Sequence, residues 1–572
     1  MAVARRWVFA SADMGLAQEL AEALSIPVPV AAALLGRGVS DPLSAQAFLN
    51  PRLRDLHDPL AMRDMDLAVF RTVAAMKAGQ RIAVHGDYDA DGITATALLA
   101  SFFEAVGYPV RTCLPERLRE GYGLSKDRIA ALAAEGVRLL IAVDCGVSNV
   151  AEVAFARSLG VDTVVLDHHQ PGPSLPDAAA VVDPHREDCD FPFKDLSAAG
   201  IAFYFAGALR RALVREGRIR DGEVDLKPLL DFAAIGTIAD VVPLLSDNRV
   251  IVAAGLRRLN EEPRVGIVAL RAVAKVAPGK PMTSGTVAFT LAPRLNATGR
   301  MGDAAASLSL LLSRDPEEAK RHAETLDREN QNRRLVEAQV LAAALKQVED
   351  AGGPQGRIVV VAGEGWHPGV VGIVASRLVE RYFRPAVVLG IEDGIAKGSC
   401  RSVKGFDIGH ALKRLRHILL KHGGHAMAAG LTLEAGRIGE FVEAVRSLAE
   451  KEVPDLALVP SILVDAVVQP KDVSDALLRS LIYLQPFGVG NPEPVFALVA
   501  AQVKSSRRVG QNGEHCQMTI GDPPLRAVWF NALQCPDVGA IVDVAFTVSV
   551  DDLSGEPRLK VRDVRPAGGD GA

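Results

Sequence analysis

Three aspartates, Asp87, Asp89 and Asp91, stand within five residues in the segment 85–92, whose sequence is HGDYDADG. They follow an apolar, strand-like run at 82–84 and precede a helical pattern. Neighbouring carboxylates repel one another, so a strand end tolerates them only where cations bind or where the acids reach into water. The segment is therefore either a cation site or a crowded turn, and other residues must decide which.

Further residues of metal-ligand type follow other apolar runs. Asp144 follows the run 139–143, Asp167-His168-His169 follows 163–166, and Asp240 ends the apolar helical segment GTIAD at 236–240. Taken singly, an Asp at a strand end is usually a helix cap or turn residue, and a His pair is usually on the surface. Because the carboxyl ends of parallel strands meet at one edge of a sheet, we expect these residues to converge there.

This combination of residue types indicates which metal and which reaction to expect. Carboxylates and imidazoles without thiolates favour Mn²⁺ or Mg²⁺ over structural zinc. Several carboxylates, one of them able to bridge, suggest two ions about 3.5–4 Å apart, which activate water and contact the attacking and leaving oxygens at phosphorus. The residues predict metal-assisted hydrolysis of a phosphoester or phosphoanhydride.

The elements that must position these residues alternate along the chain from residue 81. Apolar strand-like runs separated by amphipathic helices predict βαβ units, and hence a mostly parallel sheet with helices on both faces. The expected strands are 82–84, 110–114, 139–143, 163–166 and 180–182, and the expected helices are 93–106, 126–134, 150–159, 197–215 and 227–239.

The pattern changes twice after this region. Residues 317–351 are charged, Ala-rich and free of Gly and Pro, which predicts one long helix between domains. A second α/β pattern follows, with strands at 358–361 and 386–389 and helices near 370–382, 408–420 and 436–450. Later runs, at 495–503, 525–530 and 540–550, alternate or are β-branched, and predict a small all-β barrel or sandwich.

The predicted fold class is therefore α/β in two domains joined by a long helix, with a C-terminal all-β domain. The expected division is a helical segment at 1–60, a catalytic α/β domain at 61–310, a connecting helix at 311–355, a second α/β domain at 356–456, a β domain at 457–566 and a Gly-rich tail at 567–572.

Composition narrows the function classes. The 572 residues are 49% hydrophobic and 23% charged, an ordinary globular balance, and the net charge of −5 means that any nucleic-acid surface must be local. The N-terminus lacks a sustained apolar run, and the longest uncharged apolar run, 197–209, is too short to span a bilayer. The six cysteines show no C-x-x-C spacing, which fits reduced thiols. We expect a cytoplasmic protein without membrane contact.

Several segments together resemble a known family. The Asp-His-His tripeptide, the acidic segment 85–92 and VDCG at 143–146 resemble the DHH phosphoesterase superfamily. Within it, 85–92 and 236–240 are similar to the RecJ family of single-strand-specific 5′→3′ DNA exonucleases. The likeness continues through PRLNATGRMG at 293–302, GWHPGVVG at 365–372, GGH at 423–425 (the signature of the associated DHHA1 domain) and QPFGVGNPEP at 485–494 (the family's approach to its OB-fold).

The resemblance implies a role for each residue of the expected metal site. Asp87 would hold one Mn²⁺ or Mg²⁺ ion and Asp144 would bridge two, while the ligands of the second ion would be Asp89, His168 and Asp240. His169 would lie toward the scissile phosphate. His85 and Asp91 would orient the ligands. One departure is Thr298, where the family commonly has a second small residue; we expect no effect on activity.

Local basic charge gathers in 397–425, which holds one acid, Asp407. Such a run is usually a solvated helix face. The segment KGSCRS at 397–402, however, is small, hydroxyl-bearing and cationic, which suits a phosphate pocket. The resemblance implies that Ser399, Arg401 and Arg117 bind a terminal 5′ phosphate. The other implied phosphate or DNA contacts are Arg294, Asn296, Arg300, Trp366, His367 and His425.

Two aromatic groups leave alternatives open. Trp366 either stacks on a base or packs into its own domain, and the sequence favours neither. In the last domain, the mixture of charge and aromatic rings expected of an OB groove comes from Lys504, Arg507, Arg508, Trp529 and Phe530.

The resemblance implies a monomeric single-stranded-DNA-specific 5′→3′ exonuclease of DNA repair, mismatch repair and recombination, which releases 5′-mononucleotides and has a helicase and a single-strand-binding protein as partners. One alternative is a DHH-type pyrophosphatase, or a phosphodiesterase of short oligonucleotides or cyclic dinucleotides; the β domain argues against it, because a small substrate needs no OB-fold. Another alternative is a non-catalytic replication scaffold, against which the complete set of acids and histidines argues.

Overall fold

The computed structural model describes residues 5–11, 13–116, 120–532, 534–550 and 556–568. The chain divides into two compact units. The N-terminal unit comprises Ala12–Asn330 together with Asp475–Pro494, and the C-terminal unit comprises Met1–Ser11, Gln331–Ser474 and Val495–Ala572. Each unit is described separately.

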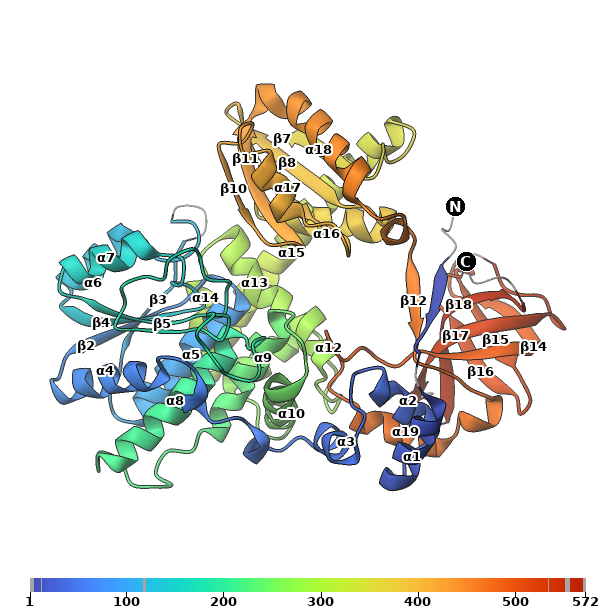
Figure 1. The fold of residues 1–572 in the computed structure, drawn as a ribbon, viewed down its shortest axis with the longest axis horizontal. Coiled ribbons are helices and arrows are strands. Elements are labelled where there is room, and N and C mark those ends of the chain that lie inside the picture. The colour runs from blue at the N-terminus through green and yellow to red at the C-terminus, as the bar shows by residue number, and fades with distance from the viewer. Residues whose placement is uncertain (1–4, 12, 117–119, 533, 551–555, 569–572) are drawn as a thin grey trace. The chain divides into compact units, whose positions relative to one another are not determined.

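A five-stranded parallel sheet forms the centre of the N-terminal unit (Figure 1). Its strand order is β3-β2-β4-β5-β6, and every neighbouring pair is parallel, as the sequence predicts. The strands are β2 (Arg81–His85), β3 (Arg111–Cys113), β4 (Val137–Val143), β5 (Asp162–Leu166) and β6 (Ala180–Val182).

Helices cover both faces of this sheet because alternate strand residues point to opposite sides. Ile82, Val84 and Ile141 belong to one core cluster, whereas Ala83 and Leu140 belong to another. The first cluster is closed by α4 (Met65–Lys77), α5 (Ala90–Ala105), α8 (Ala198–Arg215) and α9 (Leu230–Ala239), and the second by α6 (Lys126–Ala134) and α7 (Val150–Ser158).

More helices extend the N-terminal unit beyond the sheet. They are α1 (Met14–Leu24), α2 (Val28–Leu35), α3 (Pro42–Leu49), α10 (Ser246–Glu261), α11 (Val265–Val273), α12 (Ser284–Thr286), α13 (Ala292–Met301), α14 (Ala305–Leu312) and α19 (Asp475–Tyr483), with a π-helical turn, Val287–Leu291, leading into α13. No single described helix has the length and apolar character needed to cross a membrane, although α1 and α2, bent by 117°, pass as a pair on those two measures.

The long helix expected near 315–350 is α15 (Pro316–Asp350). Its first half contributes Ala319 and Leu326 to the core of the N-terminal unit. Its second half contributes Val340 and Val348 to a cluster of the C-terminal unit. A polar helix with apolar positions at both ends can thus belong to two cores.

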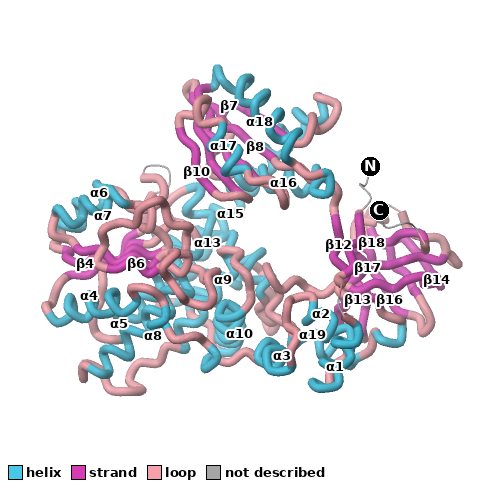
Figure 2. Tube along the Cα trace, viewed as in Figure 1, coloured by secondary structure: helices cyan, strands magenta, loops and turns pink. Residues whose placement is uncertain are grey.

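The first sheet of the C-terminal unit, which includes β7, β8 and β10 in Figure 2, is mixed. Its strand order is β10-β11-β9-β8-β7. The sequence predicts β7 (Val359–Glu364) and β8 (Ala386–Glu392) but not β9 (Ile395–Arg401), β10 (Lys421–Gly424) or β11 (Ala428–Glu434). β9 and β10 are rich in Gly and Lys, which are uncommon in strands, so pairing with neighbours rather than local propensity forms them. The helices of this domain are α16 (Val371–Tyr382), α17 (Ile408–Arg414) and α18 (Ile438–Glu452).

The second sheet of the C-terminal unit closes into a five-stranded barrel. Its order is β14-β15-β16-β18-β17, and β17 pairs again with β14. Closure removes the exposed strand edges, and the arrangement is that of an OB-fold. The strands are β14 (Phe496–Val509), β15 (His515–Ile520), β16 (Leu525–Trp529), β17 (Ile541–Val550) and β18 (Pro557–Pro566), with β13 (Ala466–Val467) added beside β14.

Two sequence expectations differ from the structure. The N-terminal segment, expected to be helical, begins with strand β1 (Arg6–Phe9), which pairs in parallel with β12 (Ser461–Val464) and buries Trp7. The expectation of six thiols is wrong for Cys516 and Cys535, which form a disulfide across 19 residues; the other four cysteines are free and buried. In both cases the partner is remote in sequence, so no local pattern indicates the contact.

Candidate metal centre

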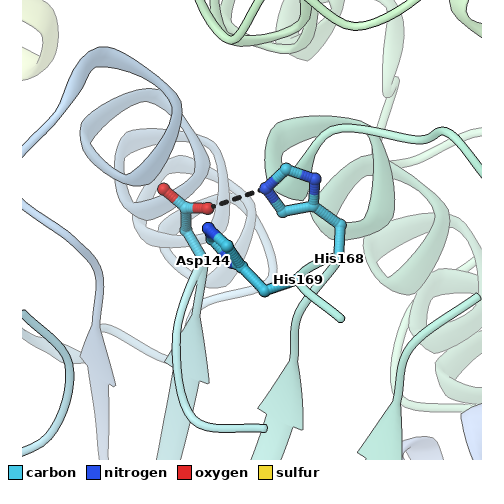
Figure 3. Close-up of side chains that lie close together, drawn as sticks. All are labelled: Asp144, His168 and His169. Atoms are coloured by element: carbon cyan, nitrogen blue, oxygen red, sulfur yellow. Dashed lines mark ion pairs between the residues drawn. The ribbon is translucent and has the colours of Figure 1, made fainter. Parts of the chain in front are cut away.

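The predicted convergence of acids and histidines is present at the carboxyl edge of the parallel sheet. Among the described residues, three groups have ligand atoms that all lie within 4.8 Å of one another. These groups are Asp87, Asp89 and Asp144; Asp144, His168 and His169 (Figure 3); and Asp91, His168 and Asp240. Asp144 and His168 each belong to two of the groups, and of these two only the carboxylate of Asp144 has two oxygens with which to bridge two ions.

The segment after β2 is held in a tight turn by close backbone contacts. A Cβ on Gly92 would lie 2.5 Å from the Asp87 nitrogen, so only glycine fits there. The Asp89 side chain caps α5, since its Oδ1 accepts hydrogen bonds from the backbone nitrogens of Asp91 at 3.0 Å and Gly92 at 3.2 Å. The turn that seemed merely crowded in the sequence is thus fixed by the start of α5, with its carboxylates gathered at one edge.

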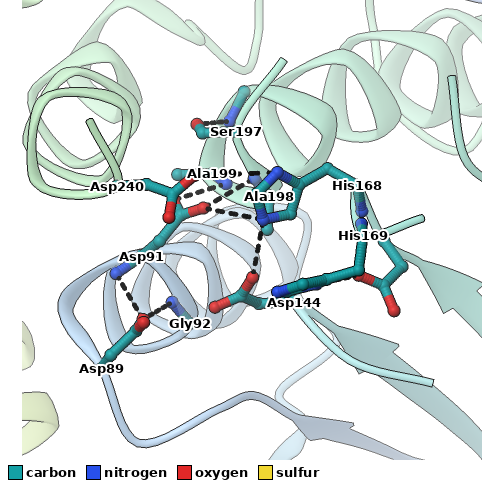
Figure 4. A network of polar contacts seen from close by, with 12 residues as sticks. Asp89, Asp91, Gly92, Asp144, His168, His169, Ser197, Ala198, Ala199 and Asp240 are labelled. Carbon is teal, nitrogen blue, oxygen red and sulfur yellow. Dashed lines mark hydrogen bonds and ion pairs between the residues drawn. The ribbon is translucent and has the colours of Figure 1, made fainter. Parts of the chain in front are cut away.

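Asp91 plays a different part from its two neighbours. Its side chain is buried, and its two oxygens accept hydrogen bonds from the backbone nitrogens of Ala198, at 2.7 Å, and Ala199, at 3.0 Å (Figure 4). Asp91 therefore caps the N-terminus of α8 from the first turn of α5. Oδ2 of Asp91 also lies 4.0 Å from Nε2 of His168. Asp91 is therefore next to the candidate metal ligands, although both of its oxygens accept hydrogen bonds from the start of α8.

His168 links the acids that come from β4 and α9. Its Nε2 lies 3.2 Å from Oδ1 of Asp144, and its Nδ1 lies 3.7 Å from Oδ2 of Asp240. The carbonyl oxygen of His168 is 2.6 Å from Nδ1 of His185, a contact that the sequence did not indicate. The His168 imidazole thus lies between two carboxylates, and its backbone carbonyl is in contact with the ring of His185.

The electrostatics of this cluster call for a cation. Burial, reinforced by Asp89 and Asp91, raises the pKa of Asp144 well above its usual value. Burial also raises the pKa of Asp240 to about 8, although His168 opposes the rise. Burial alone would lower the pKa of His168, but Asp240 and Asp91 outweigh it and raise that pKa. Several buried carboxylates beside so little positive charge fit a hard divalent cation with oxygen and imidazole ligands.

Asp167, the first residue of the tripeptide, organises the loop after β5. Its Oδ1 accepts hydrogen bonds from the backbone nitrogens of His168, at 2.8 Å, and His169, at 3.2 Å, and it lies 2.8 Å from Nδ1 of the His169 ring. Its Oδ2 accepts a bond from the nitrogen of Val147 at 3.0 Å. Burial acts to raise the pKa of Asp167, but the His169 ring and these donors lower it to about 2. Asp167 is therefore ionised and orients His169.

Two more residues complete the surroundings of the site. The hydroxyl of Tyr122 is 3.1 Å from Nδ1 of His169 and donates to the carbonyl of Asp144 at 3.2 Å; no motif in the sequence marks it. His85 is buried, with Nε2 3.4 Å from the Gly123 carbonyl, and burial lowers its pKa to about 4. The orienting role expected of His85 stays a prediction.

Residues of α13 brace the turn after β2. Oδ1 of Asn296 accepts a hydrogen bond from the backbone nitrogen of Ala90 at 2.7 Å. The Nε of Arg294 lies 2.9 Å from Asp327 on α15, in a mostly buried ion pair. Both side chains thus have contacts inside the unit, and DNA contact by them, or by the half-buried Arg300, stays a prediction. Arg117, expected in the phosphate pocket, lies outside the described residues.

The C-terminal unit holds a cradle suited to a phosphate. Ser399 and Arg401 lie two residues apart on β9, with Nη1 of Arg401 donating to Oγ of Ser399 at 2.9 Å. A Cβ on Gly372, in the first turn of α16, would lie 3.0 Å from that Oγ and 3.2 Å from Nη2 of Arg401. The first turn of α16 contains no acid, and its N-cap has no side-chain bond. A helix N-terminus, a hydroxyl and a guanidinium therefore meet over a glycine.

Comparison with known proteins agrees with these features. The N-terminal domain of the DHH family matches residues 81–237, the DHHA1 domain matches 355–451, and the RecJ OB domain matches 464–563. The single-stranded-DNA-specific exonuclease RecJ of Bacillus subtilis is 37% identical over 569 residues, covering 98% of this chain and 70% of the relative. That of Escherichia coli is 36% identical over 510 residues, covering 85% of this chain and 87% of the relative. The chain belongs to the RecJ family.

A solved structure of this family has the same fold. RecJ from Thermus thermophilus in complex with Mn²⁺ matches with a TM-score of 0.84 and 31% identity, over 99% of this chain and 81% of that one. Another structure of the Thermus RecJ, in complex with Mg²⁺, matches with a TM-score of 0.78 and 30% identity over 99% of this chain and 79% of that one.

The other residues predicted to contact DNA differ in how far they are buried and in what they contact. Trp366 packs, half-buried, against the core beneath α16, where a Cβ on Gly363 would lie 2.2 Å from its ring; this favours packing over stacking. Nδ1 of His367 accepts a bond from the Gly369 nitrogen at 3.0 Å, and His425 is exposed between β10 and β11. On the barrel, Lys504, Arg507 and Arg508 lie on β14, while Trp529 and the exposed Phe530 lie at the end of β16.

Proposed function

We propose that this chain is a metal-dependent exonuclease that degrades single-stranded DNA from its 5′ end. The observation that carries the proposal is the cluster of Asp87, Asp89, Asp144, His168 and Asp240 in one unit, of which Asp87 and Asp144 are buried and the other three half-buried. It occurs in a chain that matches, over 98% of its length, a relative named for single-stranded-DNA-specific exonuclease activity.

The acids and His168 are the residues that would hold the metal. One group, Asp87, Asp89 and Asp144, offers carboxylates alone, and the other ligand atoms come from His168 and Asp240. This geometry places Asp89 beside Asp87, so we assign it to the first ion rather than to the second. When bound there, Mn²⁺ or Mg²⁺ offsets the carboxylate charge, lowers the pKa of water and stabilises charge on the phosphoryl oxygens.

His169 is the residue that we assign to the scissile phosphate. Its side chain is 34% exposed, more than that of His168, which is 10% exposed. Because ionised Asp167 lies 2.8 Å from its Nδ1, the tautomer with a proton on Nδ1 is favoured. Nε2 is then the atom that exchanges a proton or a hydrogen bond with the substrate.

The polarity of digestion would come from the cradle in the C-terminal unit. Ser399, Arg401 and the N-terminus of α16 supply a hydroxyl, a guanidinium and a positive helix end, the three groups that suit a dianionic terminal phosphate. We expect Arg401→Ala to slow digestion of 5′-phosphorylated strands. The ratio of the digestion rates of 5′-phosphorylated and 5′-hydroxyl strands should therefore fall. Equal behaviour of Arg401→Ala and wild type on both ends would refute this assignment.

The decisive experiment digests long single strands labelled at the 5′ or the 3′ end, with Mn²⁺, Mg²⁺ or a chelator. Early release of 5′-label as a mononucleotide, only with metal, supports the proposal, and Asp144→Asn should lose this activity. Release of 3′-label first refutes the direction. Hydrolysis of dinucleotides alone would indicate a short-oligonucleotide phosphodiesterase, and no metal-dependent hydrolysis would indicate a scaffold.

The proposal has consequences for how the protein works in the cell. A single-strand nuclease acts on duplex DNA only after the strands are opened, so we expect a helicase and a single-strand-binding protein as partners in repair and recombination. We also expect a monomeric chain in the cytoplasm. Sedimentation of the full chain and digestion of duplex DNA with and without an added helicase test these expectations.

A further inference from the structure

The turn that follows Asp240 carries backbone strain. Val241 has φ +64°, in the left-handed region that a β-branched residue rarely adopts. Its side chain is exposed, so packing of that side chain does not explain the conformation. Such a conformation is strained and persists only where the surroundings impose it. The position of Asp240 therefore depends on whatever holds this turn.

A segment from far along the chain lies against the turn. The backbone nitrogen of Leu244 donates to the carbonyl of Val489 at 2.8 Å. A Cβ on Gly488 would lie 2.6 Å from Cδ1 of Leu244, which is buried. Gly490 has φ +74°, and a Cβ there would lie 3.1 Å from Leu245. Gly488 and Gly490 thus pack directly against the side chains of Leu244 and Leu245, and a Cβ at Gly488 fits only if the buried Leu244 side chain moves. Gly490 needs glycine also for its positive φ.

Asn491 gives this segment its shape. It is fully buried, and its Nδ2 donates to the carbonyls of Leu484, at 2.7 Å, and Pro486, at 2.9 Å. Its Oδ1 accepts a hydrogen bond from Nε of Arg37 at 2.6 Å, and its backbone pairs with that of Gly488. The segment 484–491 is therefore a closed loop with its own internal bonds.

The other end of the turn is tied to the same segment through Arg249 of α10. This guanidinium is only 2% exposed and stacks 3.8 Å from the ring of Phe48. Its nitrogens donate to four carbonyls, those of Phe48 at 2.7 Å, Leu484 at 3.1 Å, Tyr483 at 3.0 Å and Gln485 at 2.8 Å. Loss of the segment would leave a buried cation short of acceptors, so α10 and the segment stay together.

We propose that residues 484–491 are a positioning element for Asp240. They brace the strained turn from Val241 to Leu245, and Arg249 fixes the start of the helix that follows. The motif 485–494, expected from the sequence to begin the barrel domain, thus belongs to the site in the N-terminal unit. The chain runs from β13 into this element and from it into β14, so the barrel is joined covalently to the support of a metal-ligand residue.

This proposal rests on the proposed metal-dependent cleavage, and its test separates the two. The variants are Gly488→Ala and the bulkier Gly488→Val in the full chain. The matched control is Gly207→Ala on α8 of the same unit, where a Cβ would meet only Leu226, at 3.8 Å. The readouts are Mn²⁺ affinity by calorimetric titration, the metal dependence of kcat and of KM, and hydrogen exchange of the Leu244 amide.

We expect Gly488→Ala to weaken Mn²⁺ binding about tenfold, in the range seen when an orienting partner of a metal ligand is lost. Gly488→Val should weaken it further. Both should lower kcat more than they raise KM for DNA, and both should speed exchange at Leu244, while Gly207→Ala should match wild type. Wild-type Mn²⁺ affinity and kcat in folded Gly488→Ala would overturn the positioning role, even if its melting temperature fell. Lack of metal-dependent hydrolysis in wild type would instead refute the proposed function.

Discussion

Asp183, which follows β6 beside the metal centre, is an acid whose replacement has a calculable effect. Its side chain is fully buried, and its Oδ1 accepts a hydrogen bond from the His185 nitrogen at 2.7 Å. Its Oδ2 has no hydrogen-bond partner among the described residues. Burial raises the pKa of Asp183 to about 8, and the ionised Asp167 adds to the rise. Asp183→Asn keeps the shape and the acceptor but cannot ionise.

The sign of the effect follows from proton binding. An acid with a raised pKa holds a proton in the folded protein that the unfolded chain has released, so its contribution to the free energy of unfolding falls as pH rises from about 4 to about 8. About three pKa units of this change lie between pH 5 and pH 8, an upper bound of about 4 kcal/mol at about 1.4 kcal/mol per unit. Relaxation and water entry reduce such penalties, and we expect about 2 kcal/mol.

The assay is scanning calorimetry of the full chain in chelator at pH 5 and pH 8, following the transition of the N-terminal unit. For a unit of roughly 340 residues, about 2 kcal/mol corresponds to about 3 °C. Asp183→Asn should therefore gain about 3 °C relative to wild type on going from pH 5 to pH 8. Comparing the two pH values cancels any constant cost of the new amide. A parallel pH dependence of the two proteins would refute the reasoning.

Three other substitutions test separate parts of the structure. Asp144→Asn should abolish the thermal stabilisation by Mn²⁺ and lower kcat at least about 100-fold. The melting temperature without metal should stay the same or rise, because the substitution removes a buried charge. Retained stabilisation by Mn²⁺ would contradict the bridging assignment. Val241→Asn should raise the free energy of unfolding by about 1 kcal/mol in urea titrations, since Asn tolerates the left-handed region; a loss of stability would show that Val241 has an unseen packing role. Arg294→Ala should lower the free energy of unfolding by about 2 kcal/mol, because it removes the ion-pair partner of Asp327. The salt dependence of DNA binding should stay unchanged. A shallower salt dependence would show that Arg294 contacts DNA instead.

The parallel sheet and its helices could be predicted because their signals are local. The strands β2, β4, β5 and β6 are short, mainly apolar runs, and helices α6 and α7 begin at the residues the pattern indicates. The strands β9, β10 and β11 could not be predicted in the same way. Residues such as Lys397, Gly398 and Gly424 carry no strand preference, and their conformation comes from pairing with neighbours.

For the metal centre, residue type and position after a strand were enough to predict that Asp87, Asp144 and His168 converge. Which contacts each aspartate makes could be seen only in the structure. Asp91 resembles Asp89 in the sequence, yet its oxygens bind the start of α8, 107 residues away. Tyr122 and His185 contact the site without any motif, because contacts of that kind depend on how loops fold back.

The sequence alone determined the chemistry: an apolar strand ending in carboxylates, repeated along a βαβ chain, brings hard-metal ligands to one edge whatever surrounds them. Only the tertiary structure decided what holds them there. In the sequence the motif at 485–494 resembles the approach to an OB-fold, but Gly488 and Asn491 lie against Leu244 and Arg37, and all four residues belong to the N-terminal unit. The physical reason is that a strained turn is stabilised by whichever backbone can approach it closely, and that partner is set by packing rather than by local preference.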